Sequence, residues 1–376
     1  MVQRQLRILH ALGTLNPGGV ETWLLQVLNC MDRDRLQFHF CTFGPQAGLY
    51  DAQVEKLGGR IVRCPKGRNP WAFARRFRKI LREGKYDVVH SHVHLFSGAL
   101  LRWAKAEGVP SRIAHSHTSL DEKHGTLARR YYRLLMKSWI ERYATHGLAA
   151  SRPAAVALFG ENWEADGRVR VLHCGIDLSP FQGPIDRDEI RNELGLPLDA
   201  PVVGHVGRFD LQKNHPFLLE ISGEILKRRP EIHFLLVGDG RFRPEIEAKA
   251  RAMGVSGNIH FAGIRTDVPR LMRGGMDLFV FPSLWEGLPV TLIEAQAAGL
   301  RCIISETITT EANILPQQVI RLSLSTRPEE WAAVALDAVG RGRVKGEMTL
   351  SVLAQTDYCV ERSTSILSSF YAKVGG

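Results

Sequence analysis

Short apolar runs alternate with amphipathic stretches along the whole chain of 376 residues. Runs rich in β-branched and aromatic residues predict strands, whereas apolar residues that recur every three or four positions predict helices. In the first half the predicted strands are Leu6–Leu12, Phe38–Phe43, Arg60–Val62, Asp87–His92, Arg112–His117 and Gly147–Ala150. In the second half they are Val202–Val206, His233–Val237, Asn258–Ala262, Asp277–Phe281 and Cys302–Ser305.

This regular alternation predicts parallel sheets covered by helices. The strands are almost entirely apolar, as expected when both faces of a sheet are buried. A chain of this length favours two domains, and the Gly- and Pro-rich stretch 173–184 separates the halves. We therefore predict an α/β protein with two Rossmann-like, doubly wound domains, residues 1–175 and 176–355, followed by a C-terminal segment, 356–376, that holds one more helix.

The charge is distributed unevenly between the halves. Residues 1–175 carry 27 Lys and Arg against 14 Asp and Glu, a net charge of +13, whereas the remainder carries 22 against 25, a net charge of −3. A basic half predicts an anionic partner, which could be nucleic acid, an acidic membrane surface or a phosphorylated substrate.

Much of the positive charge lies in two predicted helices, 71–82 and 127–143. Their apolar positions are Phe73, Phe77, Ile80 and Leu81 in the first, and Tyr131, Leu134 and Leu135 in the second. Their basic positions are Arg75, Arg76, Arg78, Lys79, Arg82, Arg129, Arg130, Arg133 and Lys137. Such helices can lie on an anionic membrane, although the same pattern also fits helices whose apolar face packs on a sheet.

No apolar run approaches the ~20 residues that a membrane span needs, and the N-terminus is typical of a first strand, not of a signal peptide. The six cysteines are scattered, with no CxxC pair, which fits a reducing compartment. We therefore expect a cytoplasmic protein that binds peripherally to the inner face of the plasma membrane.

Ligands of doubly wound domains bind at the carboxyl ends of the strands, so the residues that follow each strand are the candidates for chemistry. Gly18 and Gly19 follow the first strand and precede a helix. Glycines there allow backbone N–H groups to approach a phosphate, but the motif departs from GxGxxG and also fits a plain strand-to-helix turn.

Five histidines cluster at two strand ends, in "HSHVH" and "AHSHTS". They are His90, His92, His94, His115 and His117. Alternate residues of a strand point to one face, so each HxH pair shares a face. This pattern fits a metal site, a hydrogen-bonding or catalytic role in a cleft, or histidines packed in a core.

In the second half, Arg208 and Lys213 follow a strand and precede a helix, where they could bind a diphosphate or form a solvated basic loop. Gly238, in a Gly-Asp-Gly turn, could also approach a ligand. In "LWEGLPVTLIEAQAAG", Glu286 lies in the loop after a strand and Glu294 lies inside the following helix. One carboxylate could bind sugar hydroxyls and the other a ribose diol, or the stretch could be a capped helix with an exposed Glu.

The ordered motifs "GRFDLQKNH", "LLVGDG", "IHFAGIRTDVPRLM" and "DLFVFPSLWEGLPVTLIEAQAAG" resemble the retaining glycosyltransferases of family 4, which have the GT-B fold. The resemblance covers almost the whole chain and is most specific over residues 204–305. It is closest to bacterial capsular and exopolysaccharide transferases, in which "RIAHSH" and "EAQAAGL" also recur. This resemblance implies two domains facing across a cleft, with the C-terminal helix returning to the N-terminal domain.

The resemblance also implies roles for individual residues. Arg208 and Lys213 match the residues that hold the donor diphosphate, Glu286 matches the residue that binds the donor sugar, and Glu294 matches the residue that binds the ribose. The other implied donor-site residues are Gly18, Gly19, Gly238, Ile264, Arg265, Gly287, Leu288 and Pro289. A cleft histidine matches His117 or His115, of which His117 is preferred, and Cys174 stands where the family usually has Asn.

The implied reaction transfers a hexose or N-acetylhexosamine from a UDP- or GDP-linked sugar, with retention and without a metal or other cofactor. The implied acceptor is a saccharide, lipid-linked if the basic helices bind an anionic membrane. The chain lacks an Asp-x-Asp metal-binding motif at the donor site. A sugar-nucleotide epimerase with the same architecture is the alternative, and a non-catalytic nucleic-acid-binding protein is a weaker one, because no nucleic-acid-binding motif is present.

Overall fold

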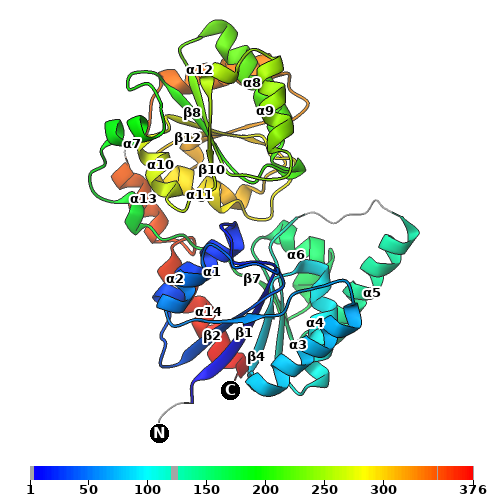
Figure 1. Ribbon diagram of the computed structural model, residues 1–376. Helices are drawn as coiled ribbons and strands as arrows, with labels where there is room; N and C mark the ends of the chain where they lie inside the picture. The colour runs from blue at the N-terminus through cyan, green and yellow to red at the C-terminus, as the bar shows by residue number, and fades with distance from the viewer. Residues whose placement is uncertain (1–3, 120–125, 345, 376) are drawn as a thin grey trace. The chain divides into compact units, whose positions relative to one another are not determined.

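The computed structural model describes residues 4–119, 126–344 and 346–375. Contacts within the chain divide it into two compact units (Figure 1). Unit 1 comprises residues 1–175 and 360–376, and unit 2 comprises residues 176–359. The first boundary lies within the Gly- and Pro-rich stretch, and the second lies just before the last helix, so that this helix belongs to unit 1.

Unit 1 contains a parallel sheet of seven strands in the order β3-β2-β1-β4-β5-β6-β7. The strands are β1 (Leu6–Leu12), β2 (Leu36–Thr42), β3 (Arg60–Arg63), β4 (Val88–Ser91), β5 (Ser111–Ser116), β6 (His146–Ala149) and β7 (Val169–Val171). The helices are α1 (Gly19–Cys30), α2 (Asp51–Lys56), α3 (Pro70–Gly84), α4 (Ser97–Ala106), α5 (Leu127–Tyr143), α6 (Arg152–Phe159) and α14 (Val360–Gly375). The predicted Rossmann-like architecture is therefore confirmed for this half.

Alternation along β1 assigns the two faces of this sheet. Leu9 and Ala11 join a core with Phe73 and Phe77 of α3, so one face is covered by α3, α4 and α5 (Figure 1). His10, between them in sequence, points to the opposite face, where α1 packs beside α14. The histidine motifs therefore lie beneath α1 and α14.

Unit 2 contains a parallel sheet of six strands in the order β10-β9-β8-β11-β12-β13. As in unit 1, the second and third strands lie on one side of the first strand, and the later strands lie on the other. The strands are β8 (Val202–Val206), β9 (His233–Val237), β10 (Ile259–Gly263), β11 (Leu278–Phe281), β12 (Arg301–Ser305) and β13 (Val319–Leu322). The helices are α7 (Arg187–Glu193), α8 (His215–Arg228), α9 (Arg243–Ala252), α10 (Val268–Gly274), α11 (Val290–Ala297), α12 (Pro328–Gly340) and α13 (Gly346–Ala354).

The eleven predicted strands are all present, with ends shifted by two residues at most. The two that the sequence did not predict, β7 and β13, form the last strand of each sheet. An edge strand pairs on one side only and is short and half-buried here, so it lacks the long apolar run that marks an inner strand.

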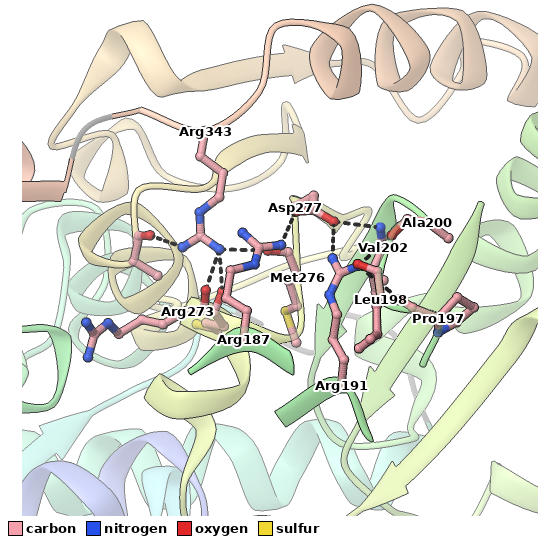
Figure 2. Close-up of polar contacts among 12 residues, drawn as sticks. Arg187, Arg191, Pro197, Leu198, Ala200, Val202, Arg273, Met276, Asp277 and Arg343 are labelled. Atoms are coloured by element: carbon pink, nitrogen blue, oxygen red, sulfur yellow. Dashed lines mark hydrogen bonds and ion pairs between the residues drawn. The ribbon is translucent and has the colours of Figure 1, made fainter. Parts of the chain in front are cut away.

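An aspartate anchors the middle strands at the amino-terminal edge of each sheet. In unit 2, Asp277 accepts hydrogen bonds from Val202 N (2.9 Å) and from the guanidinium groups of Arg187 (2.5 Å) and Arg191 (2.7 Å) (Figure 2). In unit 1, Asp87 accepts from Arg7 N at 2.8 Å in the corresponding position. The sequence predicted Asp277 as the first residue of a strand. In the structure it precedes β11 and anchors it.

Two arginines in unit 2, the buried Arg191 and the half-buried Arg343, donate to backbone carbonyl groups where chain segments end. Arg191 donates to the carbonyl oxygens of Pro197, Leu198 and Ala200 (2.7–3.0 Å). Arg343 donates to those of Arg273 and Met276, at 2.6 and 2.8 Å (Figure 2). These contacts tie α7 and the segment after α12 to the start of the sheet.

The helix α5 packs on unit 1 through one end only. Of the predicted apolar face of Tyr131, Leu134 and Leu135, Tyr131 and Leu134 are 69% and 64% exposed, so this face does not pack on the sheet. Met136 and Ile140 are the buried residues of α5, so its C-terminal half packs on unit 1 and its N-terminal half projects. In α3, Phe73, Phe77 and Leu81 are buried and Ile80 is half-buried, so this helix follows the alternative in which the apolar face packs on a sheet.

Candidate functional site

The centre of the candidate site in unit 2 is an ion pair between Lys213 and Glu286. Lys213 Nζ lies 2.5 Å from Glu286 Oε1, and both side chains are largely buried. Gln212 Nε2 donates to the other carboxylate oxygen of Glu286 at 2.8 Å and to Trp285 O at 2.9 Å. Both oxygens of the Glu286 carboxylate are therefore held in place after β11. Gln212 was missed by sequence reasoning, although it adjoins Lys213 in the motif "GRFDLQKNH".

The position of Lys213 depends on a glycine and a turn. A Cβ on Gly207 would lie 3.0 Å from the Cγ, Cδ and Cε atoms of Lys213, so the glycine gives the lysine methylenes room against the backbone. Asn214 follows with φ of 52°, a left-handed conformation that Asn tolerates, and ends the short turn before α8. The Lys213 ammonium also lies 4.5 Å from the centre of the Phe281 ring, a cation–π contact.

The turn after Glu286 leads directly into α11. Gly287, Leu288 and Pro289 are buried, and Pro289 is the N-cap residue of α11. The helix has no side-chain cap, and Leu292 N donates to Pro289 O at 3.0 Å, so the N–H groups of its first two residues are available as donors at the end of β11. Helix dipoles and free N–H groups favour an anion or an electronegative oxygen at such a position.

Glu294 is the fifth residue of α11 and is buried, not exposed. Burial raises the pKa of its carboxyl group from 4.5 to about 7, because the charged form loses its hydration. A buried carboxyl group at this pKa changes charge near neutral pH, which structural helix residues rarely do.

Three further predicted residues of unit 2 differ in how they are held. Arg208 is exposed after β8. Arg265 forms ion pairs with Asp267 (2.7 Å) and Glu193 (2.6 Å), so its guanidinium is directed towards α7, whereas the neighbouring Ile264 is half exposed. Of these residues, Arg208 and Ile264 present their side chains to solvent.

Gly238 is required by the fold itself. Its φ is 136°, and a Cβ there would lie 2.1 Å from Gly207 O. The turn thus brings the backbone after β9 against the backbone after β8, and Gly207 N donates to Val237 O at 2.9 Å. The close approach that the glycine permits is to another loop of the same unit, which accounts for the glycine without a ligand.

In unit 1, the strand-end histidines form one buried cluster with His10 of β1. His10, His90 and His115 have no exposed surface, whereas His92 and His117 are half-buried. Burial lowers the pKa of His117 and of His10 to about 3, so both rings are neutral. His10 was missed by sequence reasoning, although its position, pairing with His90 across β1 and β4, follows from the strand register.

The cluster is closed by residues from other segments. Trp23 of α1 packs on His115 and His117, with ring centres 5.6 and 6.1 Å apart. His117 Nδ1 contacts Cys174 Sγ at 3.9 Å. Of the two histidines that the sequence left as candidates, His117 is the one with exposed surface. His94 lies after β4 with φ of 48° and is in neither of the groups of described histidines whose ligand nitrogens lie close together.

Gly18 and Gly19 begin α1 after β1. Gly18 is the N-cap residue in an extended conformation and supplies no side-chain cap. A Cβ on Gly18 would lie 2.5 Å from Glu21 Oε2, so this carboxylate already lies against the first turn of α1. A phosphate at this helix terminus would have to displace the Glu21 carboxylate.

Among the described residues, two histidine groups have ligand atoms within 4.8 Å of one another: His10, His90 and His92, and His92, His115 and His117. Their donor type suits Zn²⁺ and its neighbours in the transition series. No group of this kind includes Glu286 or Glu294.

Comparison with known proteins defines the class. Residues 186–335 match the family described as glycosyl transferases group 1, and residues 17–180 match glycosyltransferase family 4. A protein of Bacillus subtilis (strain 168) named "Putative glycosyltransferase EpsF" is 36% identical over 376 residues, covering 99% of this chain and 97% of EpsF. The chain belongs to glycosyltransferase family 4 and is a glycosyltransferase.

Two other proteins extend the comparison. An Escherichia coli enzyme named UDP-Gal:α-D-GlcNAc-diphosphoundecaprenol α-1,3-galactosyltransferase is 31% identical over 240 residues, which are 60% of this chain and 59% of that enzyme. The crystal structure of Anabaena Alr3699/HepE in complex with UDP and glucose superimposes with a TM-score of 0.77 at 18% identity, covering 98% of this chain and 100% of the other. This likeness establishes the GT-B fold.

Proposed function

We propose that this glycosyltransferase moves a hexose or N-acetylhexosamine from a UDP- or GDP-linked sugar to a lipid-linked saccharide, with retention of anomeric configuration, in surface polysaccharide biosynthesis. The observation that carries the proposal is the Glu286 carboxylate held by Lys213 and Gln212 at the start of α11. A carboxylate, a cation and the backbone N–H groups that begin α11 lie together at the carboxyl end of the sheet, which supports binding of a nucleotide sugar there.

The donor would use these groups in different ways. Arg208 and Lys213 supply positive charge for the diphosphate, and the N–H groups that begin α11 add to it. Glu286 accepts hydrogen bonds from the sugar hydroxyls, and Glu294 binds the ribose. Fixed cations and dipoles stabilise the charge that develops on the leaving diphosphate, so the proposed transfer requires no metal ion.

The proposed reaction breaks the bond between the anomeric carbon and the diphosphate oxygen. The acceptor hydroxyl forms its new bond on the same face of the sugar, and its proton passes to an oxygen of the leaving diphosphate. No protein nucleophile takes part. His117 would contribute a hydrogen bond at the sugar, because it is the one of the two candidate histidines that reaches the surface of its unit.

The acceptor proposal depends on the surface of α5 and on the Escherichia coli relative, whose name gives a diphosphoundecaprenol-linked acceptor. None of the described helices is both long and apolar enough to cross a membrane. The N-terminal half of α5 exposes Leu127 (80%), Tyr131 and Leu134, and the exposed Arg130 lies among them. Exposed apolar side chains next to basic ones are typical of a helix that lies in an anionic membrane surface.

Donor binding is tested by thermal shift with a panel of UDP- and GDP-sugars and the free nucleotides. We expect one nucleotide class to raise the Tm of the wild type and not of Glu294→Ala. The matched control is Glu245→Ala, an exposed glutamate of α9 in the same unit, which should respond as the wild type does. Equal stabilisation of wild type and Glu294→Ala would contradict the assigned site.

Membrane binding is tested by sedimentation with vesicles of neutral lipid and of neutral lipid mixed with phosphatidylglycerol. We expect binding to the anionic vesicles alone, reduced in the variant Tyr131→Ser/Leu134→Ser. Leu198→Ser is the control, because Leu198 is also exposed but lies in unit 2. Failure to bind either kind of vesicle would contradict the proposal that α5 binds a membrane.

A further inference from the structure

The histidine cluster of unit 1 is organised as two separate hydrogen-bonded rows. In the first row, His10 Nδ1 lies 3.0 Å from His92 Nε2, and His92 Nδ1 lies 2.9 Å from His117 Nε2. His117 Nδ1 then meets Cys174 Sγ at 3.9 Å. In the second row, the Tyr371 hydroxyl meets His90 Nδ1 at 2.6 Å, and His90 Nε2 meets His115 Nδ1 at 3.0 Å. Only the first row reaches His117 by hydrogen bonds.

The ring geometry favours hydrogen bonding over metal chelation. The ring centres of His92 and His117 are 5.2 Å apart, and their facing nitrogens are 2.9 Å apart. The rings therefore lie end to end, with nitrogen facing nitrogen, and the pair His10–His92 repeats this arrangement at 5.3 and 3.0 Å. Ligands of a tetrahedral ion must instead aim their lone pairs at one common point.

In a row of neutral imidazoles the tautomers are coupled. Each neutral ring has one N–H and one lone pair, so each contact needs a donor on one side and an acceptor on the other. The direction of one hydrogen bond therefore fixes the direction of the next. Either every ring in the row carries its proton on Nδ1, with the bonds running from His10 to Cys174, or every ring carries it on Nε2, with the bonds running the other way.

The buried end of the row decides between the two directions. His10 Nε2 is buried and has no hydrogen-bond partner among the described residues, and Phe38 and Phe40 lie against the ring. If the bonds ran towards His10, this end would be a buried, unpaired N–H. If they run away from His10, it is an unpaired acceptor, which folded proteins tolerate more readily than an orphan donor.

We propose that His10 and His92 are positioning residues that hold His117 as its Nδ1–H tautomer, so that His117 donates a hydrogen bond on the side now contacted by the Cys174 thiol. Sulfur is a weak acceptor, and a sugar or phosphate oxygen would take this N–H in preference to it. The inference rests on the proposed function in one respect only, the placement of His117 at the sugar.

The tautomer can be read directly from the ring ¹⁵N resonances of the full-length protein labelled with ¹⁵N-histidine. His117 is assigned by loss of its signals in His117→Gln. We expect the wild type to show a protonated Nδ1 and an unprotonated Nε2. His92→Leu removes the donor to His117 and should abolish this preference, whereas His92→Asn keeps an amide donor near the place of Nδ1 and should preserve it.

Two more variants separate positioning from folding. His10→Phe keeps an aromatic ring beside Phe38 and Phe40 but makes His92 the end of the row. His92 is half-buried, unlike His10, so water can reach its Nε2 in either tautomer, and the variant should also mix the His117 tautomers. His90→Gln is the matched control, because His90 is equally buried but belongs to the second row. It should leave the His117 tautomer unchanged.

Kinetics then show whether the tautomer matters. We expect kcat/KM for transfer to fall about tenfold in His92→Leu, the effect of one neutral hydrogen bond, and to recover in His92→Asn. A His117 protonated on Nε2 in the wild type would overturn the proposal, as would stoichiometric Zn²⁺ binding to the wild type that is lost in His92→Leu. The expected tautomer with unchanged kcat/KM in His92→Leu would instead overturn the role of His117 in transfer and leave the donor site of unit 2 unaffected.

Discussion

Lys213 Nζ lies 2.5 Å from Glu286 Oε1, and neither side chain is more than 14% exposed. In a pair so close and so little hydrated, replacing one partner should lower the free energy of unfolding more than replacing both. Removing one partner leaves an uncompensated buried charge, at a cost of about 3–5 kcal/mol, whereas neutral replacements of both avoid that cost.

We therefore expect Lys213→Met and Glu286→Gln each to lower the free energy of unfolding by about 3 kcal/mol, and the double variant to lose less than the sum of the two. Urea unfolding of the four proteins measures the coupling. Lys227 and Glu224 are the matched control, since their atoms are also 2.5 Å apart but the lysine is 70% exposed. Their coupling should stay below about 1 kcal/mol. Equal coupling in the two pairs would contradict the prediction that burial strengthens the interaction of Lys213 with Glu286.

The raised pKa of Glu294 predicts a stability that falls with rising pH. The unfolded carboxyl group loses its proton near 4.5 and the folded one near 7, so between these values the folded state binds more protons. The stabilising effect of the buried neutral acid is complete below pH 4.5 and is lost as the pH rises to 7, a change of roughly 3 kcal/mol.

Glu294→Gln, which is neutral at every pH, should lack this contribution. The measurement is the difference in unfolding free energy between wild type and Glu294→Gln at intervals from pH 4 to 8. We expect the wild type to lose stability relative to Glu294→Gln as the pH rises from 4.5, and the difference to level off above pH 7. A difference that does not change with pH would show that Glu294 is not held in a poorly hydrated position.

The turn at Gly238 predicts a large effect of one methyl group. Alanine there would have to adopt φ of 136° and would place its Cβ 2.1 Å from Gly207 O, a backbone atom that cannot turn aside. We expect Gly238→Ala to lower the unfolding free energy by at least about 2 kcal/mol and, because Gly207 lies against Lys213, to weaken nucleotide-sugar binding as well. Gly257→Ala, which meets no atom within 4 Å, should change neither.

The fold was predictable because its information is local and repeated. A buried parallel strand such as Val202–Val206 is a continuous apolar run, and the residues at its carboxyl end are candidates for a site by topology alone. The candidate residues Lys213 and Glu286 were singled out in the same way. By contrast, Gln212 and His10 act through neighbours that are distant in sequence, Glu286 and His92, and only the packed structure identifies those partners.

The helix α5 shows a different limit. Its heptad-like spacing of Tyr131, Leu134 and Leu135 correctly indicated an amphipathic helix, but spacing does not say whether an apolar face meets a sheet or remains exposed. Residues Met136 and Ile140, on the same helix, meet the protein instead. The choice depends on where the helix leaves the unit, which is a property of tertiary structure.

Asp277 gives the last prediction, with a pH dependence of opposite sign to that of Glu294. Burial alone would raise the pKa of Asp277, but hydrogen bonds from Arg187 and Val202 N outweigh burial and hold the pKa below 3.8. The stability that this carboxylate contributes is therefore present above pH 3.8 and is lost as the pH falls through the lower pKa of the folded state.

Asp277→Asn keeps the size of the side chain but leaves Arg191, whose side chain is only 4% exposed, without its carboxylate. We expect the variant to lose about 3 kcal/mol at pH 7 and, relative to the wild type, to be less sensitive to acid. Asp337→Asn is the control, because Asp337 pairs with Arg341 at 2.8 Å with both side chains exposed, and it should change stability little. Equal, small losses in the two variants would mean that Asp277 does not anchor β8 and β11, since an anchor shared by two arginines and a strand N–H cannot be removed at the cost of a surface ion pair.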